Sequence, residues 1–498
     1  MADCSFGVIL LRLSEEMYIQ KAEITNIKSI EHFEIEFPNP AGWHVLIGDN
    51  GSGKSTIVRS MALALVENEF YGFRANWGEW LNKQSKEGKI KLKLFRDESF
   101  DKLIKIKTGL RSEIVKGNQI FFLNVDFLRK ETGVLYISSG EDNLEKPDGF
   151  FSSAFGPYRR FEGGNEEWES VFNNPSYTKL ASHLSIFDES VALTEPVKWL
   201  KDLNYKTLEK NEESKHTFDH LKELINSEDF LPHNSKLENI SSNGVFFKDA
   251  NGITVSVNQL SDGYRSILSL TFELIRQLIL SFGTEKVFNN IEKGEMFINL
   301  PGVVLIDEID AHLHPTWQTR IGQWFLKYFP NLQFIVTTHS PLVCRACEKG
   351  SIWRLAAPGS DEKSGEVTGI DRERLIYGNV LDAYGTGVFG ENTSISQDSN
   401  DLLNRLSELN VKSMMGLIDD KESEELQELR AKFPTENKIV SNLEKPSDTN
   451  PDLEKMIESL QSLLKPTGKK LKQKKPKDRN GKTKERGIRN STSKNTAK

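Results

Sequence analysis

Cysteine and long apolar runs are scarce in this chain. Its 498 residues include three cysteines, Cys4, Cys344 and Cys347, which are too few for a disulfide framework. No stretch approaches the ~18 consecutive apolar residues that a membrane helix needs. The first residues lack the basic segment of a secretory signal peptide, and the apolar stretch that follows is too short for one. We therefore expect a cytoplasmic protein with no membrane-spanning segment.

Positive charge is also in short supply over most of the chain, whose net charge is −7. The exception is the segment from Lys465 onward, which has fourteen lysines and arginines against two acidic residues. An acidic body binds nucleic-acid phosphates poorly, so any such contact is expected from a local patch, this tail or a partner protein. Residues 466–498 contain too few apolar residues to fold alone, and we expect a disordered basic tail.

Apolar periodicity predicts the main elements. It predicts strands over 17–24, 33–37, 43–47, 90–94, 245–247 and 253–257, helices over 56–66 and 267–280, and a helical hairpin over 194–226. The sequence after Ala356 is polar and irregular until residues 400–465, where two or three amphipathic helices are expected, one of them over Leu453–Leu464.

The length exceeds the ~250–300 residues of a usual single core, so we expect a large domain with appendages. The predicted organisation is an α/β domain over 1–385 with a helical insert at about 190–240. A helical extension over 386–465 and the tail over 466–498 would follow.

The strongest motif is a glycine-rich loop between the strand at 43–47 and the helix at 56–66. It has the spacing G-x-x-x-x-G-K-[ST], in which backbone N–H groups surround phosphates at the positive end of a helix. Lys54 is expected to reach the β- and γ-phosphates of ATP, and the Ser55 hydroxyl to bind Mg²⁺. The candidate binding residues are Gly48, Asp49, Asn50, Gly51, Ser52, Gly53, Lys54, Ser55 and Thr56.

A second motif places two carboxylates after an apolar strand. Val303–Ile306 predicts a buried strand, and Asp307 and Glu308 follow at its C-terminal end, the edge where ligands bind in open α/β sheets. Asp307 is expected to hold Mg²⁺. Glu308 is expected to be catalytic, by orienting and deprotonating the attacking water.

Two weaker signals complete the set. Ser261 and Gly263 precede the helix at 267–280, where a hydroxyl and N–H groups could bind an anion, although a plain helix cap is the alternative. His339 ends the apolar strand that follows the Asp307 strand along the chain. It is placed to contact a γ-phosphate, which makes it a second catalytic candidate.

In this order, the four motifs resemble the Walker A, signature, Walker B and switch-histidine motifs of the ABC-type ATPase superfamily. Ile24-Thr25-Asn26-Ile27-Lys28-Ser29 resembles the start of RecF- and SMC-type heads. The segment 310–315 is similar to the one that crosses the dimer interface in that superfamily. The resemblance implies an α/β ATPase head with a mixed central sheet and an antiparallel β subdomain. It also implies a homo-oligomer in which two heads sandwich ATP and Mg²⁺.

Some features depart from the pattern. The signature reads Ser-Asp-Gly-Tyr-Arg where transporters have Ser-Gly-Gly-Gln, as in soluble heads. No convincing Q-loop glutamine is present, and the segment 154–160 is its expected replacement. Arg159 or Arg160 and the neighbouring aromatic could contact nucleotide there, or the segment could be an ordinary loop.

Two pairs of residues have metal-ligand spacing. Cys344 and Cys347 lack a second pair, so two buried thiols on a helix are the expected outcome. His312 and His314 fit the interface segment better than a zinc site.

The spacing of the motifs along the chain indicates a narrower group within this superfamily. Gly53 and Ser261 are 208 positions apart, which is longer than in transporter ATPases, and long coiled coils are absent. The chain most resembles the PtuA ATPases of the Septu anti-phage system and their retron-associated relatives. That resemblance implies an ATP-dependent dimer controlling a separately encoded HNH endonuclease. The alternatives are a RecF-like DNA repair ATPase that acts directly on DNA, and a nucleotide-sensing scaffold with little turnover. An appended nuclease domain at 400–465, which contains Asp419 and Asp420, is less favoured. The segment is predicted to be helical, and it is too short for such a domain.

Overall fold

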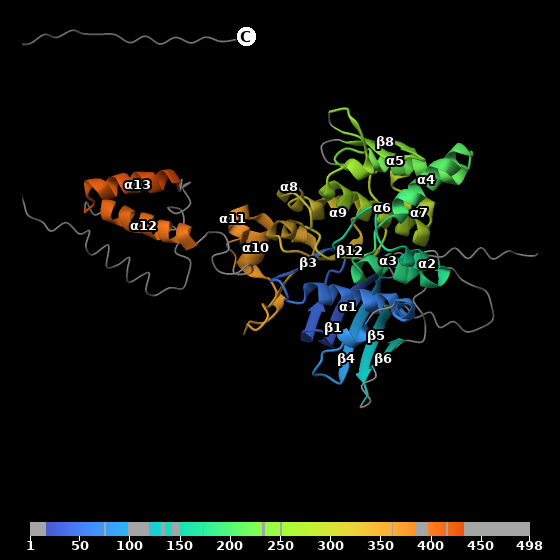
Figure 1. The fold of residues 1–498 in the computed structure, drawn as a ribbon, viewed down its shortest axis with the longest axis horizontal. Coiled ribbons are helices and arrows are strands. Elements are labelled where there is room, and N and C mark those ends of the chain that lie inside the picture. Colours follow the sequence, from blue (N-terminus) through green and yellow to red (C-terminus); the bar gives the residue numbers. More distant parts are fainter. Residues whose placement is uncertain are drawn as a thin grey trace, which may run out of the picture. The chain divides into compact units, whose positions relative to one another are not determined.

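A computed structural model of the chain describes residues 16–432, apart from 74–75, 98–118, 131–134, 142–149, 232–234, 389–396, 415–416 and the single positions 173, 250, 361, 385 and 387. The chain divides into two compact units, Met1–Gln397 and Asp398–Lys498 (Figure 1). The helix expected over Leu453–Leu464 and the basic tail lie outside the described residues.

A six-stranded sheet forms the centre of the first unit. Its order is β14-β13-β3-β12-β11-β7, and all but β14 run parallel. The strands are β3 (Gly42–Gly48), β7 (Ser152–Phe155), β11 (Gly302–Ile306), β12 (Leu332–Thr337), β13 (Ile352–Leu355) and β14 (Gly365–Glu366). Along β11, Val304 and Ile306 join one hydrophobic cluster while Val303 and Leu305 join another. The sheet is therefore buried on both faces, as continuous apolar strands require.

Helix α1 (Lys54–Val66) fills one side of this sheet. An antiparallel sheet in the order β2-β1-β4-β5-β6 packs over the same cluster, so α1 lies between two sheets (Figure 1). Its strands are β1 (Glu16–Ile27), β2 (Ile30–Glu36), β4 (Glu87–Asp97), β5 (Gln119–Arg129) and β6 (Leu135–Glu141). Short helices border this side: η1 (Glu67–Gly72), η2 (Trp77–Glu79), η4 (Glu166–Trp168), α2 (Glu169–Phe172), η5 (Pro175–Tyr177) and α3 (Thr178–Phe187).

The other side of the central sheet is covered mainly by helices. These are α6 (Asp262–Phe282), α7 (Thr284–Phe288), η8 (Ile291–Lys293), α8 (Pro315–Gln318), α9 (Ile321–Tyr328) and η9 (Pro341–Lys349). The 21-residue helix α6 has its apolar face in the same cluster as the β11 residues Val304 and Ile306. Its N-terminus is the Ser261–Gly263 motif.

The predicted helical hairpin is present, and the strands predicted at 245–247 and 253–257 correspond to a pair of antiparallel strands. Helices α4 (Glu195–Leu208) and α5 (Glu212–Ile225) pair with each other, and α4 packs on α6. A small antiparallel sheet follows, made of β8 (Lys236–Ser241), β9 (Gly244–Lys248) and β10 (Thr254–Ser256). The short helix η7 (Val257–Gln259) comes directly after β10. The predicted α/β class, with a mixed central sheet and a separate antiparallel sheet, is confirmed.

The stretch after Ala356 was predicted wrongly. The sequence after Ala356 reads as irregular, but α10 (Gly369–Tyr377) and α11 (Val380–Tyr384) form there. Leu375, Ile376 and Ala383 are buried in the cluster that covers the central sheet, and α10 packs on η9. These helices have so few apolar positions that their periodicity cannot be detected in the sequence. Tertiary packing stabilises them instead.

The second unit contains a helical hairpin. Helices α12 (Gln397–Met414) and α13 (Asp420–Lys432) bury four leucines between them: Leu406, Leu409, Leu426 and Leu429. The two helices therefore cover part of each other's apolar faces. The Asp419 carboxylate accepts a hydrogen bond from Glu422 N at 2.7 Å, so it caps α13.

Within the described part of the chain, no helix combines the length and the apolar character that a membrane span requires.

Candidate nucleotide-binding site

The phosphate loop joins the C-terminal end of β3 to the N-terminus of α1. Gly51 and Gly53 adopt positive φ angles of 79° and 96°, which glycine tolerates and other residues rarely adopt. These angles turn the chain sharply into α1, whose first N–H groups have no partner within the helix. Asp49, Asn50 and Gly51 are exposed at the tip of the loop. The loop therefore presents an accessible helix N-terminus of the kind that binds phosphate.

The Lys54 ammonium lies over this loop. Its Nζ donates hydrogen bonds to the carbonyls of Gly48 at 2.7 Å and Asp49 at 2.9 Å. Burial lowers the pKa of Lys54, while the nearby carboxylates of Asp307 and Glu308 act in the opposite direction. The loop cation and the two acidic residues after β11 thus share one electrostatic environment.

Ser55 and Asp307 meet directly, although 252 positions separate them. The Ser55 hydroxyl donates to Asp307 Oδ1 at 2.9 Å, and Thr337 Oγ1 donates to the same oxygen at 2.6 Å. Asp307 is buried, and its other oxygen, Oδ2, has no hydrogen-bond partner among the described residues. A hydroxyl beside a buried carboxylate oxygen that makes no hydrogen bond fits Mg²⁺, which prefers hard oxygen ligands.

Glu308 occupies a strained position at the end of β11. Its φ is 49°, which is unfavourable for a residue with a side chain, and its N–H donates to Thr337 Oγ1 at 2.7 Å. Thr337 therefore anchors both acidic residues, one through its carboxylate and one through its backbone. Such strain often marks a functional site.

His339 follows β12, which lies between β3 and β11 in the sheet. The histidine is exposed, whereas Thr338 before it and Ser340 after it are buried. It therefore stands at the same sheet edge as the phosphate loop and Glu308, where the C-terminal ends of the parallel strands meet.

The signature residues contact a different part of the chain. Ser261 is exposed and precedes α6, and its side chain makes no capping hydrogen bond. Gly263 packs so closely on the 310–315 segment that a Cβ there would lie 2.8 Å from the His312 carbonyl oxygen. No hydrogen bond or ion pair among the described residues joins Ser261 or Gly263 to the loop Gly48–Thr56.

The Arg159 guanidinium is directed to protein groups around the site. Its guanidinium is buried and donates to the carbonyls of Gly156, Asp307 and Glu308 and to Ser266 Oγ, each at 2.9 Å. Burial lowers its pKa to about 10, so it remains protonated near neutral pH. Arg159 thereby joins the start of α6 to the turn after β11. Arg160 is exposed.

Thr337 and Arg59 are functional candidates that the sequence reading missed. Thr337 has the contacts given above, and Arg59 Nη2 lies 3.7 Å from Asp307 Oδ2. The only signal for Thr337 is its position at the end of an apolar strand. Arg59 has none, because an arginine in a helix is usually solvated.

The structure describes both pairs that have metal-ligand spacing. Cys344 and Cys347 are buried free thiols on η9, and burial raises the pKa of both. His314 caps α8, accepting from Thr316 N at 3.3 Å. None of these residues belongs to a metal-ligand group in the described part of the chain.

A family model described as "AAA domain, putative AbiEii toxin, Type IV TA system" matches residues 44–345. The chain belongs to this family. The matched span runs from β3 to η9 and includes Lys54, Ser261, Glu308 and His339. The prediction of a P-loop ATPase domain is confirmed by this AAA-domain match.

Two curated relatives confirm the narrower resemblance. Septu protein PtuA of Bacillus mycoides (strain KBAB4) is 27% identical over 388 residues, which cover 75% of this chain and 46% of that protein. The Retron Ec83 probable ATPase of Escherichia coli is 41% identical over 126 residues, covering 25% of this chain and 22% of that protein. The chain spans about half the length of the first relative, and less of the second.

Among solved structures, an SmcHead bound to the C-winged helix domain of ScpA matches with a TM-score of 0.41 and 15% identity. That match covers 72% of this chain and 99% of the solved one. RecF-ATPrS matches with a TM-score of 0.37 and 14% identity, covering 72% and 100%.

Proposed function

We propose that this member of the AAA-domain family is an ATPase of an anti-phage defence system. The contact between Ser55 Oγ and Asp307 Oδ1 carries the proposal. Two motifs 252 positions apart meet at one sheet edge, beside Lys54 and Glu308. Together they offer oxygen ligands for Mg²⁺ and a cation for the triphosphate. The relatives named Septu PtuA and retron ATPase support the defence role.

Each residue at this edge has a role in the proposed reaction. The loop Gly48–Thr56 binds the phosphates, Lys54 neutralises them, and Ser55 and Asp307 would hold Mg²⁺. Bound Mg²⁺ would supply positive charge to the phosphoryl oxygens. Glu308 orients the attacking water and accepts its proton, and His339 contacts the γ-phosphate end of the site.

The proposed site is completed by a second copy of the chain. Ser261 is exposed at the N-terminus of α6, with its hydroxyl unused by the helix and no contact to its own phosphate loop. A partner's Ser261–Gly263 segment would supply further N–H and hydroxyl donors to the triphosphate. ATP binding would then favour a dimer.

Steady-state phosphate release tests the ATPase. The wild-type chain is expected to hydrolyse ATP in the presence of Mg²⁺. Glu308→Gln should retain ATP binding but lose turnover by at least ~10²-fold, because it removes the base while keeping the shape. Lys54→Ala should weaken binding itself. Slow turnover equal in wild type and Glu308→Gln would instead support a nucleotide-sensing scaffold.

An HNH endonuclease is the proposed partner, by the resemblance to Septu ATPases. Co-expression with the product of a neighbouring HNH gene, followed by size-exclusion chromatography with and without ATP, tests this. One co-eluting peak is expected. Separate elution in both conditions would contradict a stable complex.

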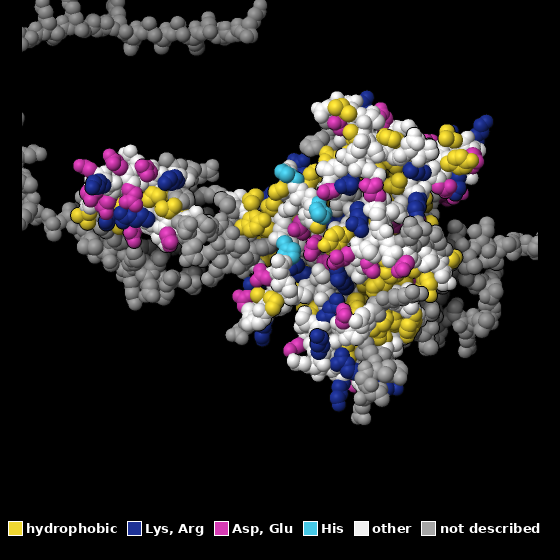
Figure 2. All heavy atoms as spheres, in the orientation of Figure 1, with side chains coloured by type: hydrophobic (Ala, Val, Ile, Leu, Met, Phe, Trp, Pro, Cys, Tyr) yellow, Lys and Arg dark blue, Asp and Glu magenta, His cyan; other side chains and the backbone are white. Residues whose placement is uncertain are grey.

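Direct action on DNA receives less support. Over most of the face in view in Figure 2, the Lys and Arg side chains of the described residues are interspersed with Asp and Glu. A phosphate-binding surface needs positive charge gathered along one track.

A further inference from the structure

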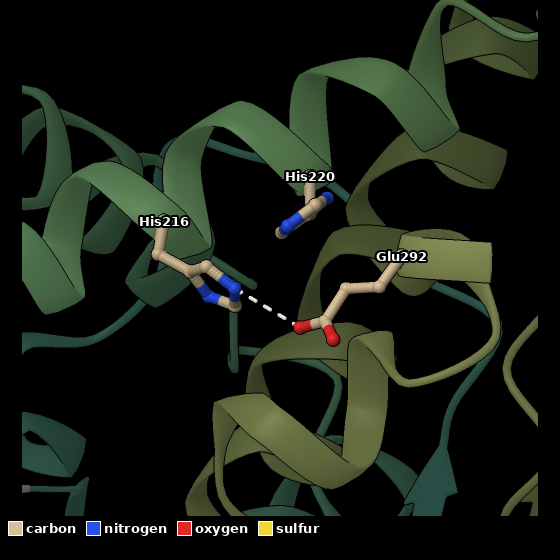
Figure 3. A group of neighbouring side chains, drawn as sticks. All are labelled: His216, His220 and Glu292. Atoms are coloured by element: carbon tan, nitrogen blue, oxygen red, sulfur yellow. Dashed lines mark ion pairs between the residues drawn. The ribbon is translucent and has the colours of Figure 1, made fainter. Parts of the chain in front are cut away.

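Three side chains away from the nucleotide site form a compact group. His216 and His220 come from α5, and Glu292 comes from η8. One ligand atom from each lies within 4.8 Å of the other two (Figure 3). Neither Cys344–Cys347 nor His312–His314, the pairs singled out in the sequence, takes part.

The geometry of the group arises from helix periodicity. Residues four apart share one face of an α-helix, so the two imidazoles lie side by side, with ring centroids 4.4 Å apart. Glu292 approaches from η8, and its Oε1 lies 3.0 Å from His216 Nε2. Tetrahedral coordination at ~2.0–2.1 Å requires ligand atoms about 3.3 Å apart, so small side-chain rotations close the site.

We propose that His216, His220 and Glu292 bind a transition-metal ion of the Zn²⁺ class. Two imidazole nitrogens and one carboxylate oxygen suit Zn²⁺ and are too soft a set for Mg²⁺. Three protein ligands leave a fourth position for water. Glu223 Oε2 lies 3.4 Å from His220 Nδ1, which positions a carboxylate behind that ring and leaves Nε2 for the metal.

The ion would tie two segments that are distant in sequence. Helix α5 belongs to the α4–α5 hairpin, whereas η8 follows α6 and α7. A hydrogen-bonding contact between Thr217 Oγ1 and Thr284 Oγ1 at 3.1 Å already joins α5 to α7, the helix that precedes η8. A metal ion would stabilise the contact between these segments, because it can bind all three side chains only when the segments are packed together.

Metal titration of the full-length, chelator-treated protein without nucleotide tests the proposal. Zn²⁺ binding is followed by competition with a chromophoric chelator. One ion per chain is expected, with His216→Ala and His220→Ala each weakening binding at least tenfold and Glu223→Gln about tenfold. His32→Ala, which removes an exposed histidine on β2, is the matched control and should bind as the wild type does.

Hydrogen exchange supplies a second readout. Zn²⁺ should slow amide exchange over α5 in the wild type and not in the double variant His216→Ala/His220→Ala. Circular dichroism of that variant checks that it is folded. Equal Zn²⁺ uptake by the folded double variant and the wild type would overturn the proposal, and so would no uptake by the wild type. A simple His216–Glu292 ion pair would then account for the contact.

Discussion

Arg159 shows how one side chain organises the proposed active site. Its guanidinium fixes the carbonyls of Asp307 and Glu308 and reaches Ser266 near the start of α6. Arg159→Ala should lower ATP turnover by ~10²-fold, because a displacement of the acidic residues by about 1 Å has that effect. It should also lower the free energy of unfolding by about 2–4 kcal/mol, since buried carbonyls lose their donor.

The neighbouring arginine provides the control for this prediction. Arg160 is exposed, so Arg160→Ala should change the free energy of unfolding by no more than ~0.5 kcal/mol. Phosphate release and urea unfolding measure both effects. Similar values for the two variants would show that the Arg159 contacts are unimportant.

His44 should make the stability depend on pH. The buried ring accepts from Ser351 Oγ at 2.9 Å and donates to the Pro40 carbonyl at 2.8 Å, and burial lowers its pKa to about 4. In the unfolded chain the pKa is 6.5, so the unfolded state binds a proton that the folded state does not. The His44 contribution is thus fully present above pH 6.5 and is lost as the pH falls toward 4.

Urea unfolding at pH 7 and pH 5 measures this effect. His44 should account for about 2 kcal/mol of the loss between these values, from the 1.36 kcal/mol that each pKa unit represents. His44→Gln should be less stable at pH 7 but should lose less on acidification. His183, also buried with a pKa lowered to about 4, would sustain the remaining slope. An unchanged slope in His44→Gln would contradict the account.

At the residue scale, local patterns predicted some contacts and missed others. Lys54, Ser55 and Asp307 stand in short motifs whose spacing reflects the chemistry of phosphate binding. Arg159 and the His216 group could not be found in this way, because each depends on a partner far away in sequence, Asp307 for Arg159 and Glu292 for His216. Their roles depend on which elements the fold brings together.

At the element scale, β3, β11 and β12 were the most predictable strands of the central sheet, whereas β7, β13 and β14 were not predicted. Both faces of β3, β11 and β12 are buried, which requires an unbroken apolar run in each. Helices α10 and α11 were missed because they bury only a few side chains each. The α12–α13 pairing was not predicted. An apolar stripe indicates that a helix packs against something, but it does not identify the element that it packs against.

A pair of substitutions in α12 tests that pairing. Leu409 is fully buried in the small cluster, whereas Val411 is 51% exposed. Leu409→Asp places a charge without a partner in the buried leucine cluster. The hairpin should therefore open, and amide exchange over 397–432 should rise to near unfolded rates. Val411→Asp should leave exchange close to wild type. Equal exchange in the two variants would show that the leucine cluster does not hold the hairpin.

On the scale of the whole molecule, the central claim is that each ATP site is shared between two copies of the chain. The sequence indicated this only by resemblance, because no single chain contains both halves of such a site in contact. The structure supports it through the exposed Ser261, whose side chain makes no capping bond. Ser261→Arg should therefore fold normally while obstructing the partner's phosphate loop.

Mixing two inactive variants tests this claim most directly. In a two-fold dimer of Lys54→Ala with Ser261→Arg, one site collects both substitutions and the other collects neither. Each variant alone should release phosphate at background rates. An equimolar mixture, exchanged before ATP is added, should recover about a quarter of wild-type activity, because half the dimers are mixed and each has one intact site. A mixture no more active than the separate variants would contradict the shared site.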